Sequence, residues 1–286
     1  MKAVLPVLTV VAAILAIWYI AVVPMNRQWV LDQAARANQP APAFGALVAE
    51  TMGLERPVLP APHQVVAELW KGVTAQAVTS KRSLVYHSWV TLSATLAGFA
   101  IGAALGILLA VGIVYNRAMD LSVLPWAIAS QMVPIVALAP MLTVVMSTMG
   151  ASGQATKAVI SAYLSFFPVA VGMVKGLRSP DRMQLDQLHT WNATGLQGFL
   201  RLRLPASMPY FFASMKVAVA ASLLGAIVAE LNQPAGLGAR LLQGSYYGQT
   251  VQIWAALLAA AILAAVLVAV VGLIERVVLR RMGLAR

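Results

Sequence analysis

Long uncharged apolar stretches alternate with shorter polar ones along the whole chain. A membrane-spanning helix needs about 20 mainly apolar residues, and residues 3–23 and 88–116 reach this length without a charge. The next apolar stretch is too long for one straight span. We therefore expect it to form a kinked third helix over residues 121–146, a Gly/Ser turn at residues 150–154 and a fourth helix over residues 158–173.

Prolines explain the expected kink. Pro125, Pro134 and Pro140 each remove a backbone hydrogen bond, which a membrane protein tolerates where neighbouring groups or a cavity satisfy the freed carbonyl. Further along the chain, a fifth span is expected at residues 211–231. A glycine-rich turn then leads to a sixth span at residues 252–274.

The composition supports this pattern. The chain has 286 residues, of which 60% are hydrophobic and 10% are charged. Soluble domains carry about 25% charged residues, so lipid must surround most of these apolar side chains. The predicted fold class is all-α, a polytopic membrane protein with six transmembrane helices. The net charge of +11 comes from scattered residues, which favours an orientation signal over nucleic-acid binding.

The N-terminal part is expected to differ from the rest. Residues 1–25 are predicted to be a retained transmembrane helix, because the apolar run exceeds the usual 7–15 residues of a signal peptide and no clear cleavage site follows. Charged residues and prolines gather over residues 26–86, so we expect a periplasmic segment of short amphipathic helices, the clearest over residues 63–73. Residues 87–286 should form the transmembrane core.

The orientation follows from the number of spans. Six spans put both termini on the same side as the polar segment 175–203, and more Lys and Arg residues fall on that side than on the other. Positive residues favour the cytoplasmic side. We expect a bacterial inner membrane protein with both termini in the cytoplasm.

Motifs for catalysis and nucleotide binding are absent. No Gly-Lys pair occurs, so there is no phosphate-binding loop of the common type. His63, His87 and His189 are scattered over three segments, and there is no cysteine. We therefore expect no catalytic residue, no metal and no cofactor in this chain.

Charges inside the expected spans are also rare. Only Lys216 and Glu230 fall there, near span ends. Ion-coupled carriers usually hold an ionisable group deep in the membrane. The pattern therefore favours an energy source outside this chain.

The most informative polar segment is residues 181–209, DRMQLDQLHTWNATGLQGFLRLRLPASMP. Leu185, Leu188 and Trp191 repeat at helical spacing, so we expect a surface helix that turns at Asn192. An exposed amphipathic helix is typical of docking into a partner's groove. A helix that rests on the bilayer or on the bundle is the alternative.

This segment resembles the cytoplasmic loop of binding-protein-dependent ABC transporter permeases, specifically the sulfonate/taurine/nitrate-type branch. Their loop has the pattern E-A-A-x-x-x-G, followed by a Leu-Pro pair. Aligned on Leu204-Pro205, the family's Glu, two Ala, Gly and following Ala-Ser fall on Asp186, Gln187, Leu188, Asn192, Ala193 and Thr194. Asp keeps the carboxylate on a shorter side chain, and Asn is well able to adopt the positive φ of a turn.

Other segments extend the resemblance to about residues 55–286. They are residues 58–62, 132–140, 166–178 and 229–238. In this family two permease subunits form the pathway, cytoplasmic ATPases drive it and a periplasmic binding protein delivers the solute. The resemblance implies a permease subunit without its own nucleotide site, in a lipid bilayer and without nucleic acid. Its expected partners are a cytoplasmic ABC ATPase dimer, a periplasmic substrate-binding protein and a second permease subunit, most simply as a homodimer.

The resemblance also assigns roles to residues. It implies a coupling loop over residues 175–209 that docks on the ATPase. The residues expected to form the contact are Leu185, Asp186, Leu188, Trp191, Asn192, Ala193, Thr194, Gly195, Leu204 and Pro205.

Four residues on the third and fifth helices are candidates for the solute pathway. Ser130, Gln131 and Pro134 offer polar side chains and unpaired backbone groups within an apolar span. An interhelical hydrogen bond is the alternative for Gln131. Glu230 is expected at a periplasmic gate or at a contact with the binding protein, and an interfacial charge that snorkels to water is its alternative.

Glycines predict close helix packing. Gly98, Gly102 and Gly106 form a doubled G-x-x-x-G on one helical face, which lets two membrane helices approach closely. The alternative is that small residues are simply common in membrane helices.

The sequence leaves the solute open, within the small and often anionic organic compounds that this branch handles. Two other function classes also remain. One is an ion-coupled carrier or channel, and the other is a membrane scaffold that docks a cytoplasmic protein without transport.

Overall fold

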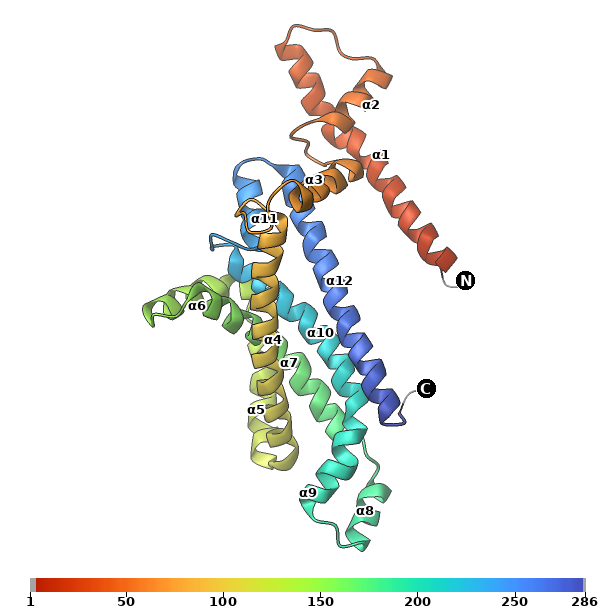
Figure 1. Cartoon of the computed structure of the whole chain (residues 1–286), viewed down its shortest axis with the longest axis vertical. Helices are drawn as coiled ribbons and strands as arrows, with labels where there is room; N and C mark the ends of the chain where they lie inside the picture. Colours follow the sequence, from red (N-terminus) through yellow and green to blue (C-terminus); the bar gives the residue numbers. More distant parts are fainter. Residues whose placement is uncertain (1–3, 285–286) are drawn as a thin grey trace. The chain divides into compact units, whose positions relative to one another are not determined.

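Helices account for the regular secondary structure of residues 4–284, the part of the chain that the computed structural model describes (Figure 1). Ala3, at the start of the first expected span, and the C-terminal Arg286 lie outside these residues. The elements in chain order are α1 (Val4–Arg36), α2 (Phe44–Gly53), α3 (Pro62–Thr74), α4 (Leu84–Tyr115), α5 (Arg117–Ser130), α6 (Ile135–Thr148), α7 (Gly153–Leu177), α8 (Arg182–Thr190), α9 (Gly195–Gly198), the π-helix η1 (Phe199–Arg203), α10 (Leu204–Glu230), α11 (Leu237–Tyr246) and α12 (Thr250–Arg281).

Five helices within residues 4–284 are long and apolar enough to cross a membrane. They are α1, α4, α7, α12 and one continuous helix that runs through α9, η1 and α10 from Gly195 to Glu230. The pair α5 and α6 gives a sixth crossing if both helices belong to one span. The predicted fold class, an all-α polytopic membrane protein, is confirmed.

The third span differs from its prediction. Instead of one kinked helix over residues 121–146, α5 and α6 are separate helices that meet at an angle of 100°. Pro134 stands directly before α6 with extended backbone angles (φ −62°, ψ 116°). A proline cannot donate to a carbonyl one turn earlier, and it pushes the preceding residue out of the helical region. Pro125 and Pro140, by contrast, lie inside α5 and α6.

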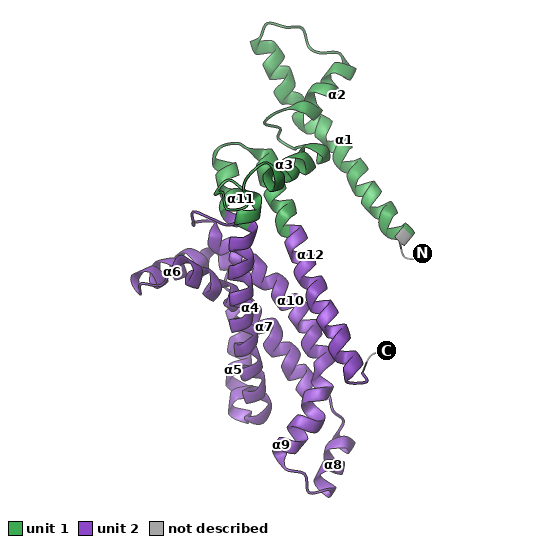
Figure 2. Cartoon of the chain, viewed as in Figure 1, with its two compact units in different colours: residues 1–87, 239–260 green, residues 88–238, 261–286 purple. Residues whose placement is uncertain are grey.

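The chain forms two compact units (Figure 2). Unit 1 comprises residues 1–87 and 239–260, and unit 2 comprises residues 88–238 and 261–286. The division into an N-terminal helix, a periplasmic segment and a core stays a prediction.

In unit 1, α1 extends to Arg36, well beyond the expected end of the first span. Asn26 on α1 is fully buried and holds the loop before α3. Its side-chain oxygen accepts hydrogen bonds from the backbone N–H groups of Val58 (2.8 Å) and Leu59 (3.2 Å), and its amide nitrogen donates to the Leu59 carbonyl (2.8 Å). A polar side chain is tolerated there because the loop satisfies its hydrogen bonds.

The expected glycine-rich turn before the last span contains a helix, α11. Arg240 on α11 donates a 2.9 Å hydrogen bond to the carbonyl of Arg82, which ties α11 to the segment before α4. Burial lowers the pKa of the Arg240 guanidinium, and the negative charge of Glu68 opposes this shift. The last span, α12, extends to Arg281, beyond its expected end.

The helix α7 lies at the centre of unit 2 and is the most buried of the candidate spans. Its side chains Val169, Met173 and Leu177 form a core with Ile113 of α4 and Ala218 of α10. By comparison, α1 and α12 expose most of their apolar side chains, as expected for helices whose solvent is lipid.

Candidate functional site

The segment that the sequence predicts to be a coupling loop forms the short helix α8 at one end of unit 2 (Figure 1). It begins after Asp181. The backbone N–H of Asp181 donates a hydrogen bond to Oε1 of the Gln184 side chain (3.2 Å), which caps the start of the helix. Every residue of α8 keeps some exposure to solvent. A helix with no buried residue is not part of the core, and it is available to a partner.

The apolar residues of α8 and Trp191, which directly follows this helix, differ in their exposure. Leu185 and Leu188 are half-buried and line a cavity of about 210 Å³ together with Tyr115 and Ala193. Trp191 and Met183, in contrast, are 69% and 77% exposed. Leu185, Leu188 and Trp191, which helical spacing predicts on one face, therefore differ in their exposure. Met183, which the spacing did not indicate, is as exposed as Trp191.

The end of α8 has a defined turn. Asn192 has a positive φ of 51°, its N–H donates to the His189 carbonyl (2.9 Å), and the N–H of Ala193 donates to the Leu188 carbonyl (3.0 Å). This is the Schellman arrangement, in which the left-handed position usually holds Gly and sometimes Asn. The structure thus gives the physical reason why Asn192 can stand where the loop pattern that the sequence resembles has Gly.

The chain then enters a second helix at once. Thr194 and Gln197 cap α9 reciprocally: the N–H of Gln197 donates to Thr194 Oγ1 (3.3 Å) and the N–H of Thr194 donates to Gln197 Oε1 (2.9 Å). From Gly195 the helix continues through η1 into α10 without a break. Leu204 and Pro205, the Leu-Pro pair of the alignment, lie half-buried at the start of α10. Asp186 and Gly195 are exposed.

Two arginines near this loop contact the chain itself. Arg203 donates to the carbonyl of Leu177 (3.0 Å), at the end of α7, and its guanidinium lies over the Tyr115 ring. Arg178 pairs with Asp120 (2.9 Å). These contacts join the loop to α4, α5 and α7.

The expected pathway residues Ser130, Gln131 and Pro134 lie together at the break between α5 and α6. Ser130 Oγ donates to the carbonyl of Ala127 (2.8 Å). The carbonyl of Ser130 accepts hydrogen bonds from the hydroxyl of Tyr163 on α7 and from the N–H of Val133 (3.4 Å). The side chain of Gln131 donates to its neighbour, Ser130 Oγ (3.4 Å), and within residues 4–284 it forms no interhelical hydrogen bond, the alternative that was expected for it.

Gly98, Gly102 and Gly106 all face α7. A Cβ atom at Gly98 or Gly102 would overlap Ser161 or Ser165, and one at Gly106 would lie 2.6 Å from the Phe166 carbonyl oxygen. Only glycine therefore fits at these three positions. The close approach of two helices, which the spacing predicts, is the contact between α4 and α7.

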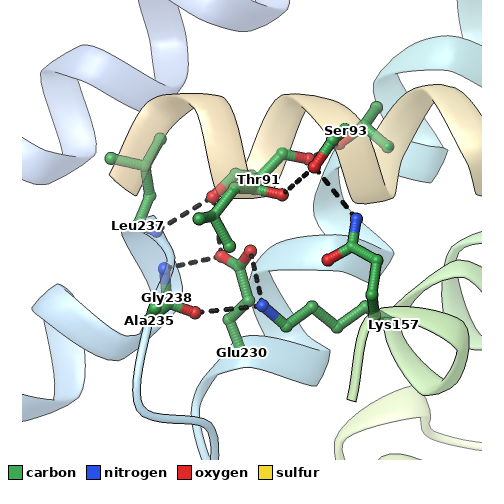
Figure 3. Close-up of polar contacts among 10 residues, drawn as sticks. Thr91, Ser93, Lys157, Glu230, Ala235, Leu237 and Gly238 are labelled. Carbon is green, nitrogen blue, oxygen red and sulfur yellow. Dashed lines mark hydrogen bonds and ion pairs between the residues drawn. The ribbon is translucent and has the colours of Figure 1, made fainter. Parts of the chain in front are cut away.

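Glu230 lies in a different environment from the one expected. Its side chain is fully buried at the end of α10, so the expectation of an interfacial charge that snorkels to water is wrong, and a binding protein has no access to it here. Glu230 Oε2 accepts hydrogen bonds from Thr91 Oγ1 (2.7 Å) and from the N–H of Gly238 (3.1 Å) (Figure 3). Thr91 Oγ1 in turn accepts from the N–H of Leu237 (2.9 Å).

Lys157 completes this buried cluster. Its ammonium lies 3.7 Å from Glu230 Oε1 and donates to the carbonyl of Ala235 (3.1 Å) (Figure 3). Local sequence patterns did not indicate Lys157 or Thr91, because nothing in them links these residues to Glu230. A signal was present in Gly236, which has a φ of 126° and whose Cβ would overlap the Glu230 carboxylate. Glycine is needed there because the turn wraps closely around the buried charge.

These features coincide with a known family. A family model described as "Binding-protein-dependent transport system inner membrane component" matches residues 102–284. A "Probable ABC transporter permease protein" of Haemophilus influenzae is 31% identical over 66% of this chain and 76% of its own length. The formylaminopyrimidine transport permease protein ThiX of Halalkalibacterium halodurans is 33% identical, over 63% of this chain and 68% of its own length.

A third relative represents the branch that the sequence resembles. SsuC of Bacillus subtilis, whose name gives aliphatic sulfonates as its proposed solute, is 23% identical over 78% of both chains. The family match covers α8, the helix from Gly195 to Glu230 and, in the buried cluster at its end, both Lys157 and Glu230. This chain therefore belongs to the family of binding-protein-dependent transport system inner membrane components, the permease subunits of import-type ABC transporters.

Proposed function

We propose that this permease forms the solute pathway of an ATP-driven importer and that α8 couples it to a cytoplasmic ATPase. The observation that supports this proposal most directly is the exposed apolar surface that Met183 of α8 and Trp191, the residue directly after α8, form. Large exposed apolar side chains on a short helix are typical of a docking element.

The helix that follows supports a mechanical role. It runs unbroken from Gly195, next to α8, to Glu230. At 1.5 Å per residue, such a helix transmits a displacement at one end to the other end about 50 Å away. When the ATPase dimer closes on ATP, α8 moves with the ATPase, and the helix shifts as a rigid body between an inward-facing and an outward-facing arrangement.

The partners follow from the family and remain part of the proposal. We place the chain in a bacterial inner membrane with both termini in the cytoplasm, on the distribution of Lys and Arg residues. The pathway then forms between two copies of this chain, a periplasmic binding protein delivers the solute, and the ATPase dimer meets α8. ATP hydrolysis takes place on the ATPase, and this chain contributes no catalytic residue.

For the solute pathway we propose the break between α5 and α6. Discontinuous membrane helices expose backbone groups that bind solutes in many transporters, and Ser130, Gln131 and Pro134 gather at such a break. The proposed solute is a small organic compound. Lys157 and Lys216, both inside candidate spans, are paired with Glu230 and Glu275, so neither supports a preference for anions.

A direct test uses Trp191→Ala in the full complex with its ATPase and binding protein, reconstituted in lipid. We expect loss of ATPase co-purification or of binding-protein-stimulated ATP hydrolysis, with unchanged elution of the permease on gel filtration. Trp29→Ala is the matched control, because Trp29 is an exposed tryptophan on α1, away from α8 in the chain. Normal stimulation in Trp191→Ala would refute the coupling role, and a complex that binds ATPase without any transport would favour a scaffold.

A further inference from the structure

An apolar groove in unit 1 has no part in the coupling mechanism. It lies between α1 and α3, has a volume of about 550 Å³, and is lined by Leu15, Tyr19, Val66 and Trp70 among others. Its walls are almost wholly apolar.

The helix α3 has two faces of opposite character. Val66, Trp70 and Val73 lie on one stripe at helical spacing, and they are 57%, 69% and 43% exposed. Glu68 and Lys71 face a separate polar cavity instead. A helix with an exposed apolar stripe that includes tryptophan, and a charged opposite face, is typical of a helix that lies in the membrane interface.

The position of the groove along α1 indicates the level in the membrane at which the groove lies. The apolar part of α1 ends at about Val23, and Asn26 and Arg27 follow. Tyr19 therefore lies in the last apolar turn, where aromatic residues anchor proteins at the membrane surface. Trp18, next to it, contacts Trp254 at the start of α12 with ring centroids 4.9 Å apart. The groove thus opens at the boundary between the headgroups and the acyl chains.

The groove is also continuous with a lipid-facing surface. Leu15 forms one wall, and it belongs to the exposed apolar surface of α1, a candidate span of which only 6% is buried. Tyr19 and His63 close the polar rim, with the Tyr19 hydroxyl 3.4 Å from His63 Nδ1 and the two rings stacked. An occupant must therefore be apolar inside the groove and polar at its rim.

From this geometry we propose that the groove between α1 and α3 binds the acyl chain of a membrane phospholipid. The bound chain covers Val66 and Trp70, and its headgroup lies at the rim near Tyr19 and His63. Binding buries apolar surface that α3 otherwise exposes to water, and it holds α3 against α1 in the interface. The proposal is independent of the ATPase coupling described above.

The absence of cysteine from the chain makes a precise test possible. Val66→Cys in the full-length protein is labelled with an NBD fluorophore and placed in phosphatidylcholine nanodiscs, where some lipids carry a nitroxide on the acyl chain near the headgroup. Lys71→Cys, on the polar face of the same helix, is the matched control. We expect the nitroxide lipid to cause an about twofold larger loss of fluorescence at position 66 than at position 71.

A second variant separates a bound lipid from general contact with the bilayer. Trp70→Ala removes one wall of the groove, so in the Val66→Cys background it should reduce the loss of fluorescence that the nitroxide lipid causes. Equal losses at positions 66 and 71 would overturn the proposal, as would an unchanged or larger loss after Trp70→Ala. Protection of position 66 from nitroxide lipid in every variant would show that protein, from a second copy or a partner, fills the groove instead.

Discussion

The Lys157 ammonium lies 3.7 Å from the Glu230 carboxylate (Figure 3), and both side chains are almost completely buried. Lys157 belongs to α7 and Glu230 to α10, and Thr91 brings α4 to the same carboxylate. A buried charge is stable only when it is paired and hydrogen-bonded. The pair therefore fixes the ends of three helices and the turn that follows α10.

Removal of one partner should destabilise the fold strongly. In Glu230→Gln the Lys157 ammonium loses its counter-charge. In Lys157→Met the Glu230 carboxylate loses its counter-charge. A broken buried pair costs about 3–5 kcal/mol. We expect a clear decrease in the temperature at which half of the detergent-solubilised protein aggregates, for both single variants.

The double variant provides the control for this pair. Lys157→Met combined with Glu230→Gln removes both charges, so we expect it to lose much less stability than the sum of the two single variants. Additive losses would show that the two side chains act independently. Lys216→Met and Glu275→Gln each break another ion pair between spans, which is partly exposed. These two variants should lose less stability than the single variants of Lys157 and Glu230.

The sequence predicted the spans because their apolar length is a local property that lipid imposes on each helix separately. The ion pair between Lys157 and Glu230 depends on two residues far apart in the chain, and local patterns contain no information about such pairs. The same holds for the break at Pro134. A proline predicts either a kink or a break, and the surrounding helices decide which one forms.

The proposed coupling loop shows a second limit of prediction from the sequence. Spacing predicted Leu185, Leu188 and Trp191 on one helical face, but it does not predict how much of each side chain the rest of the chain covers. Leu185 and Leu188 line a cavity with Tyr115, which is far away in the sequence, whereas Trp191, directly after α8, is 69% exposed. The turn at Asn192 was predictable, because few residue types other than glycine adopt a positive φ.

The contact between α4 and α7 gives a prediction about packing. A Cβ at Gly102 would overlap Ser165, so Gly102→Ala should force the helices apart and cost about 1–3 kcal/mol. Gly45→Ala is the same substitution in α2, where no atom lies within 4 Å of the added carbon. There we expect a gain of about 0.5–1 kcal/mol. Thermal denaturation of both variants checks whether stability decreases in Gly102→Ala and increases in Gly45→Ala. Unchanged stability of Gly102→Ala would contradict the close contact.

Tyr163 should stabilise the break between α5 and α6. Its hydroxyl donates to the carbonyl of Ser130, a group that the end of α5 leaves without a helical partner. Without this hydroxyl the Ser130 carbonyl keeps the long turn hydrogen bond from the N–H of Val133 (3.4 Å). Tyr163→Phe should therefore increase amide hydrogen exchange over residues 130–133, since the loss of one hydrogen bond costs about 0.5–1.5 kcal/mol. Tyr246→Phe, at an exposed tyrosine of α11, should leave exchange there unchanged. Equal exchange in all three proteins would show that the hydroxyl does not hold the break.

The turn at Asn192 links backbone strain to the proposed coupling. Asn192 and Asn38 have nearly the same positive φ, 51° and 52°, and a β-branched residue in this conformation costs about 1–2 kcal/mol. Asn192→Val should distort the end of α8 and lower binding-protein-stimulated ATP hydrolysis, whereas Asn192→Gly keeps the conformation and should preserve it. Asn38→Val imposes the same strain after α1, so its stimulation should stay normal. If Asn38→Val and Asn192→Val lose stimulation equally, general destabilisation rather than the geometry of α8 explains the effect.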